Sequence, residues 1–111
     1  MTEITMPPVV ERYMSAQSAR DATALANCFA LDGLVVDDGE TFQGRPEIQR
    51  WQIEVHRRWN FTTTLVEAHR LDAAHCDAVV HLAGDFPGGA VDLSYRFTLR
   101  DREIESLTIT A

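Results

Sequence analysis

The chain has 111 residues, of which 45% are hydrophobic, and it carries a formal net charge of −7. This length has room for one domain, so we expect residues 1–111 to fold around one hydrophobic core. The acidic charge excludes nucleic acid and an anionic membrane as expected partners, because both bind basic surfaces.

The beginning of the chain shows no targeting signal. Residues 1–8, MTEITMPP, lack the basic region of a signal peptide, and no apolar run approaches the roughly 18 residues of a membrane span. We therefore expect a cytoplasmic protein. Neither His-x-x-x-His nor His-Glu-x-x-His spacing occurs, so no metal is expected. The glycines are scattered turn residues rather than a phosphate-binding loop, and we expect no cofactor.

Helical periodicity extends over residues 7–59. A first helix over about 7–18 starts at Pro7-Pro8, and its buried face is predicted to carry Val10, Tyr13, Met14 and Gln17. Asp21 suits the N-cap of a second helix, which we expect to end near Gly33. The apolar side of this helix carries Leu25, Cys28 and Phe29. Pro46 opens a third, clearly amphipathic helix, whose apolar face carries Ile48, Trp51, Val55 and Trp59.

The rest of the chain alternates between apolar and polar residues, as strands do. Leu34–Asp37 predicts a short strand, Asp38-Gly39 a turn, and residues 41–43 a brief return strand. Longer strands are predicted over residues 61–71, 75–83, 91–100 and 103–110. Helices gathered on one face of a curved antiparallel sheet make an α+β domain, and such a domain can enclose an apolar pocket.

Asp37 is the first candidate for chemistry, because an apolar strand delivers its carboxylate to the expected mouth of the pocket. Desolvation there would raise its basicity, as a general base requires. The alternative is that Asp37 and Asp38 only form the turn. Tyr13 lies on the inward face of the first helix, where its hydroxyl could donate to a ligand oxygen or pack in the core. His81, in mid-strand, could be an acid–base group or a structural histidine.

A second set of residues is expected to line the pocket or to fill the core beneath it. The set consists of Trp51, Val55 and Trp59 in the third helix and Leu93, Tyr95 and Phe97 in the strand over residues 91–100. An aromatic stripe at helical spacing is also typical of an ordinary core, so both interpretations stay open.

The segment VVERYMSAQSARDATALANCFALDGLVVDD, residues 9–38, is followed by FQGRPEIQRW, residues 42–51. Together they resemble the SnoaL-like branch of the nuclear-transport-factor-2-like superfamily, and within it they are most similar to ketosteroid isomerase. The resemblance implies a cone-shaped, cystatin-like half barrel with a deep pocket. It also implies a homodimer, paired through the outer face of the sheet.

The resemblance implies roles for two of the candidates. Tyr13 falls at the place of the family's oxyanion-hole tyrosine, and Asp37 at the place of the aspartate that moves the proton. Leu93 takes the place of the family's second donor, an aspartic acid. Asp92 is one residue away and therefore points to the opposite face of the strand. The expected oxyanion hole thus has one donor instead of two.

We therefore expect a small isomerase- or cyclase-type enzyme that abstracts a proton next to a carbonyl of an apolar substrate without a cofactor. Asp37 would be the base, and Tyr13 would donate to the developing oxyanion. The absent second donor leaves another possibility open, a non-catalytic domain that binds an apolar ligand or a protein in the same cone. A third possibility is a dehydratase in which His81 acts with Asp37.

Overall fold

The computed structural model describes residues 6–111. Residues 1–5 include most of the stretch in which a targeting signal was sought, and they lie outside the described part. The elements are α1 (Pro8–Ser18), α2 (Ala22–Ala26), β1 (Phe29–Asp37), β2 (Glu40–Gln43), α3 (Arg45–Arg58), β3 (Phe61–Arg70), β4 (His75–Gly84), β5 (Ala90–Arg100) and β6 (Glu103–Thr110). Among the described residues, no helix is long and apolar enough to cross a membrane.

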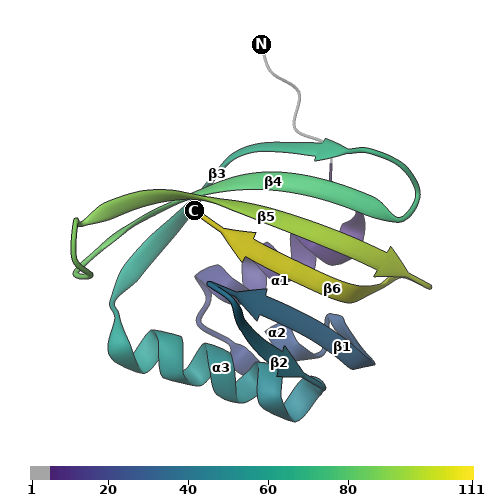
Figure 1. Cartoon of the computed structure of the whole chain (residues 1–111), viewed down its shortest axis with the longest axis horizontal. Helices are drawn as coiled ribbons and strands as arrows, with labels where there is room; N and C mark the ends of the chain where they lie inside the picture. Colours follow the sequence, from purple (N-terminus) through teal and green to yellow (C-terminus); the bar gives the residue numbers. More distant parts are fainter. Residues whose placement is uncertain (1–5) are drawn as a thin grey trace.

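The described residues form a six-stranded sheet in the order β2-β1-β6-β5-β4-β3. Neighbouring strands are antiparallel except β1 and β6, which run parallel. Figure 1 shows the sheet curving, with α1 and α2 behind it and α3 close to β2. The α+β class with a curved sheet is the one that the sequence predicted. The parallel junction in the middle of the sheet was not predicted.

Strands β3 to β6 have the predicted bounds to within one residue at each end. The alternation in β5 also places its side chains as expected, because Tyr95 and Phe97 are buried whereas Asp92 and Arg96 are exposed. In β3 the register shifts between Leu65 and Glu67. Such an irregularity bends a strand and adds twist, which is consistent with the curvature of this end of the sheet.

The second helix is shorter than the sequence predicted. α2 ends at Ala26, and Phe29 begins β1 instead of continuing a helix towards Gly33. Phe29 pairs with Ile104 of β6, and both side chains are fully buried, so sheet pairing overrides the apolar spacing that favoured a helix. The register then shifts between Phe29 and Leu34. Gly33 fits this irregularity because an added Cβ would lie only 2.9 Å from the Cβ of Phe29.

The core lies between the helices and one face of the sheet. Val35, Leu107 and Phe97 lie side by side on three neighbouring strands, and all three are fully buried. Tyr13 of α1 packs edge-on against this row, with its ring centroid 5.4 Å from that of Phe97. We call this helix-covered side the inner face of the sheet and the opposite side the outer face.

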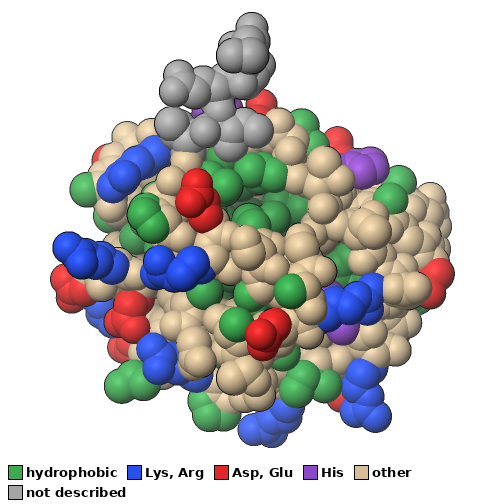
Figure 2. All heavy atoms as spheres, turned by 180° about the vertical axis from the view of Figure 1, so that it is seen from behind, with side chains coloured by type: hydrophobic (Ala, Val, Ile, Leu, Met, Phe, Trp, Pro, Cys, Tyr) green, Lys and Arg blue, Asp and Glu red, His purple; other side chains and the backbone are tan. Residues whose placement is uncertain are grey.

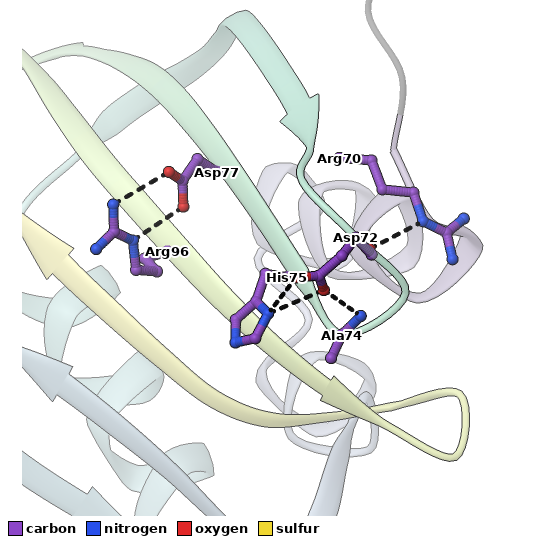
Figure 3. Close-up of polar contacts among 6 residues, drawn as sticks. All are labelled: Arg70, Asp72, Ala74, His75, Asp77 and Arg96. Carbon is purple, nitrogen blue, oxygen red and sulfur yellow. Dashed lines mark hydrogen bonds and ion pairs between the residues drawn. The ribbon is translucent and has the colours of Figure 1, made fainter.

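Charged side chains of both signs lie on both sides of the molecule. Figure 2 shows acidic and basic side chains interspersed on the side of the molecule seen from behind. On the outer face of the sheet, Arg96 donates two hydrogen bonds to Asp77, over 3.0 and 3.1 Å (Figure 3). At the β3–β4 turn, Nδ1 of His75 lies 2.9 Å from a carboxylate oxygen of Asp72 (Figure 3). Such exposed pairs contribute little to stability, since water screens them.

α3 is anchored at its first residue. Arg45 donates from Nε to the carbonyl oxygen of Phe29 over 2.9 Å, and from a terminal nitrogen to Glu103 over 3.0 Å. The start of the helix is thereby joined to the beginnings of β1 and β6. The contacts hold the buried face of α3, which carries Ile48 and Trp51, against the rest of the core.

Candidate functional site

Asp37 lies on the inner face, at the end of β1. The register places Asp37 beside Ile109 of β6, Ile109 beside Tyr95 of β5, and Tyr95 beside Ala78 of β4. Residues paired in this way point to the same side of a sheet. The carboxylate of Asp37 and the ring of Tyr95 are therefore both on the helix-covered side.

Trp51 of α3 orients the carboxylate of Asp37, because its indole Nε1 donates to Oδ2 over 3.0 Å. Burial raises the pKa of Asp37 above its usual value, since the charged form loses water. The Trp51 hydrogen bond acts in the opposite direction because it stabilises the carboxylate, and the nearby charges of Asp38 and Glu40 raise the pKa again. Asp37 is thus a carboxylate with increased basicity and a fixed orientation.

Asp37 also borders an open groove of about 750 Å³, which is lined by β1, β2 and α3. Apolar side chains form one part of its lining: Phe42, Trp51, Val55 and Trp59. The rings of Phe42 and Trp51 lie 5.9 Å apart at a tilt of 31°. The rest of the lining is charged and comprises Asp37, Asp38, Glu40, Glu47, Arg50, Glu54 and Arg58. The structure thus brings three residues of the predicted lining set, Trp51 and Val55 of α3 and Trp59 directly after it, to the same groove as Asp37.

Tyr13 lies deeper than Asp37, within a cluster of aromatic rings. It is fully buried, and its ring centroid is 6.1 Å from that of Phe29 and 6.2 Å from that of Tyr95. Its hydroxyl makes no hydrogen bond within residues 6–111. Burial raises the pKa of Tyr13 well above its usual value, and the neighbouring Tyr95 and Asp37 add to this shift. The hydroxyl therefore keeps its proton at neutral pH and can act only as a neutral donor or acceptor.

Tyr95 is held by Gln17 of α1, whose Nε2 donates to the tyrosine hydroxyl over 3.1 Å. Burial raises the pKa of Tyr95 to about 12, against the effect of the Gln17 hydrogen bond, and the charge of Asp37 also contributes to the rise. Leu93 and Phe97 share the inner face with Tyr95 and pack in the core. Tyr95 and Phe97 pack around Tyr13, and none of these three members of the predicted lining set lines the groove.

His81 lies on the outer face, away from Asp37. Its neighbour Val80 is fully buried on the inner face, and alternation along β4 turns His81 to the other side. Nδ1 of His81 is 2.6 Å from Oδ1 of Asp92, and both side chains are partly exposed. The structure does not bring His81 to Asp37, so the pairing expected for a dehydratase is not supported.

Two glutamines of the core were missed as candidates from the sequence. Gln17 and Gln52 are 4% and 1% exposed, and Oε1 of each has no hydrogen-bond partner within residues 6–111. Buried side-chain amides are normally paired, so each of these glutamines places an unpaired amide oxygen in the core. The signal was present in the sequence, because Gln17 occupies an inward position of an otherwise apolar helix face.

No protein-family model matches the chain, and no curated protein matches it either. The chain does match solved structures. A candidate polyketide cyclase from Sinorhizobium meliloti is 32% identical, with 95% of each chain covered and a TM-score of 0.89. A protein from Catenulispora acidiphila with a ketosteroid isomerase-like fold, solved in complex with trimethylamine, is 27% identical; the match covers 96% of this chain and 87% of that one, with a TM-score of 0.87.

A more distant structure shares the fold alone. A candidate ketosteroid isomerase from Kribbella flavida is 15% identical, with 93% of this chain and 74% of that chain covered and a TM-score of 0.80. The Sinorhizobium protein, in contrast, is similar in sequence over nearly the whole length of both chains. The fold, the element order and this similarity agree with the resemblance carried by residues 9–51. The chain belongs to the SnoaL-like branch of the nuclear-transport-factor-2-like superfamily.

Proposed function

We propose that the protein is a small isomerase- or cyclase-type enzyme that removes a proton from the carbon next to a carbonyl group, without a cofactor. One observation carries the proposal. Asp37, a carboxylate with a raised pKa, lies between an aromatic groove and two buried tyrosines. This environment increases the basicity of Asp37 without removing it from reach of a ligand.

The proposed reaction uses only groups of this chain. A small apolar carbonyl compound lies against Trp51 and Trp59 in the groove, and Asp37 accepts a proton from its α-carbon. The electron pair of the broken C–H bond forms a C=C bond, and the carbonyl oxygen becomes an oxyanion that the Tyr13 hydroxyl stabilises. Where a C=C bond is conjugated with the enolate, Asp37 returns the proton to the far end of the dienolate and the double bond moves, which gives isomerisation. Where a second carbonyl is present, the enolate carbon attacks it and the new alkoxide takes the proton from Asp37, which closes a ring.

The similar proteins support this class of reaction, because one is named as a candidate polyketide cyclase and another for its ketosteroid isomerase-like fold. Both reactions named begin with proton removal next to a carbonyl. The homodimer that the family resemblance implies belongs to the same proposal, with the outer face of the sheet as its interface.

Proton exchange from 2-tetralone in deuterated water tests the proposal, because this apolar bicyclic ketone has acidic protons next to its carbonyl. We expect the protein to accelerate the exchange, as followed by NMR. Asp37→Asn should reduce the rate by about 10²- to 10⁴-fold, the usual contribution of a general base. Asn keeps an acceptor for the Trp51 indole, so the fold should persist, as circular dichroism can verify.

Glu47→Gln is the matched control, because Glu47 borders the same groove but is exposed and does not contribute to the pKa shift of Asp37. It should change the exchange rate by less than about threefold, a change of under 1 kcal/mol in the barrier. Equal rates for the wild type and Asp37→Asn would eliminate Asp37 as the base.

A non-catalytic binding domain is the second candidate function, and the absence of an acid at Leu93 favours it. In that case 2-tetralone would change the tryptophan fluorescence of the groove, through Trp51 or Trp59, without any exchange above the buffer rate.

A further inference from the structure

Two buried phenols, Tyr13 of α1 and Tyr95 of β5, meet in the core. Their ring centroids are 6.2 Å apart at an angle of 77°, and neither side chain is more than 2% exposed. The Tyr13 hydroxyl has no hydrogen-bond partner within residues 6–111. Because buried polar groups are nearly always paired, a free hydroxyl at this depth marks a position that a polar ligand atom can fill.

The hydrogen bond from Gln17 leaves the proton of Tyr95 available. An amide nitrogen can only donate, so the contact over 3.1 Å from Nε2 of Gln17 uses the Tyr95 oxygen as an acceptor. The Tyr95 hydroxyl makes no second hydrogen bond among the described residues that would use its own proton. A phenol that accepts one hydrogen bond is also a better donor, because hydrogen bonds in a chain polarise one another.

Tyr95 stands next to the place where a second donor was expected. Leu93, which takes that place in the family comparison, is two residues earlier in β5 and on the same face. Tyr95 is two strands away from Asp37, so their backbones lie about 10 Å apart at about 4.8 Å per strand. Both side chains point to the inner face. A base and a hydroxyl donor are therefore on the same side of the sheet, two strands apart.

We infer that Tyr95 is a second hydrogen-bond donor to the substrate oxygen, beside Tyr13, and that Gln17 is the residue that positions it. This assignment rests on the proposed proton transfer and names the group that replaces the donor absent at Leu93. Two donors can hold an oxyanion from two directions, whereas one leaves its charge poorly compensated. The site therefore selects an apolar molecule with one carbonyl or enolate oxygen at its buried end.

Trp51 marks the route by which that oxygen reaches the two phenols. Its side chain lines the groove and also belongs to the buried core, and its indole N–H donates a hydrogen bond to Asp37. Trp51 thus lies between the groove and the buried rings. The assignment therefore requires the Trp51 ring to turn aside when the substrate enters.

The ionisation of bound 2-naphthol tests the second donor independently of proton abstraction. A naphtholate oxygen held by two phenols resembles an enolate, so the bound naphthol should ionise at lower pH than the free compound, as absorbance reports. We expect Tyr13→Phe and Tyr95→Phe each to raise the midpoint of this ionisation by about one pH unit or more. Gln17→Leu should raise it by less, because the Tyr95 hydroxyl remains.

The controls separate this inference from the proposed reaction. Ser94→Ala changes an outer-face hydroxyl next to Tyr95 and should leave the midpoint unchanged. Asp37→Asn should leave the naphtholate bound or strengthen it, because a nearby negative charge is removed. If Asp37→Asn leaves 2-tetralone exchange unchanged, the proposed reaction fails even where naphtholate ionisation still depends on Tyr95.

An unshifted midpoint in Tyr95→Phe, or no ionisation shift in the wild type, would overturn the assignment of Tyr95. The double variant Gln17→Leu/Tyr95→Phe guards against misfolding, because it removes both partners of the buried hydrogen bond and leaves no orphan amide. It should show the same raised midpoint as Tyr95→Phe and a cooperative thermal transition.

Discussion

The two largest influences on the pKa of Asp37 oppose each other. Burial on the inner face disfavours its charge, and the indole N–H of Trp51 favours it. The balance between them determines the pH at which Asp37 becomes a base. Trp51 thereby has a chemical role in addition to lining the groove, which gives this residue more than one way to affect activity.

Trp51→Phe should move the acidic limb of the pH profile of 2-tetralone exchange to higher pH. Asp37 works as a base when ionised, so the rate rises as the pH passes through its pKa. Removing the Trp51 donor removes an influence that lowers this pKa, so the limb must shift upward. Trp59→Phe is the matched control, because Trp59 lines the same groove without a hydrogen bond to Asp37. A profile that does not move would show that the hydrogen bond has no influence in solution.

Side-chain hydrogen bonds join elements of this fold that are distant in the sequence, and the start of α3 shows how they work. Arg45 reaches from the first residue of the helix to the carbonyl of Phe29 and to the carboxylate of Glu103. These groups belong to the beginnings of β1 and β6, which lie next to each other in the sheet. One guanidinium therefore fixes α3, and with it Trp51, relative to the strand that carries Asp37.

Arg45→Ala should lower the free energy of unfolding by about 1–3 kcal/mol, because the carbonyl of Phe29 loses a donor in a partly buried setting. Chemical denaturation measures this difference. Arg57→Ala serves as the comparison, since Arg57 pairs with Glu54 only on the exposed side of the same helix. That change should stay within about 0.5 kcal/mol. Equal losses in the two variants would refute the anchoring role.

The molecule as a whole is organised around β6. This strand lies between β1, to which it is parallel, and β5, to which it is antiparallel. It contributes Ile104, Leu107 and Ile109 to the core. Without β6 the sheet separates into the β1–β2 hairpin and the β3–β5 meander. The buried side chains of each part then lose the neighbours that β6 provides.

Truncation after Arg102 should therefore abolish cooperative folding. The loss removes three buried aliphatic side chains, each worth about 1.5–3 kcal/mol when fully buried, which together approach the whole stability of a small domain. Near-ultraviolet circular dichroism and a thermal scan should show no native signal or transition. Removal of Ala111 alone, which is exposed and outside β6, should leave both unchanged. A truncated chain that melts cooperatively would contradict the central role of β6.

The sequence predicted most of this fold where the deciding contacts are local. Alternation in residues 61–110 predicted four strands, and the structure confirms their bounds closely. The prediction failed at Phe29, because its partner Ile104 lies far along the chain. Local spacing favoured a helix there, and no local signal indicates a parallel neighbour.

The candidate site could be predicted only as a set of residues, without their contacts. Asp37 and Trp51 were both candidates, but the hydrogen bond between them depends on how α3 crosses β1, which the sequence does not specify. Tyr95 was expected in the lining, yet its partner Gln17 served only as a marker of helix spacing. The face on which His81 lies, by contrast, follows from strand alternation once the register is known.

The central position of β6 also has a consequence for biosynthesis. A ribosome makes the strands in chain order, so β6, which joins the two parts of the sheet, is synthesised after the other strands. Until residues 103–110 have emerged, the edges of β1 and β5 that β6 later covers are unpaired, and such edges readily recruit other chains. We therefore expect the nascent chain to fold in one late step, once residues 103–110 have left the ribosome, with chaperones protecting it until then.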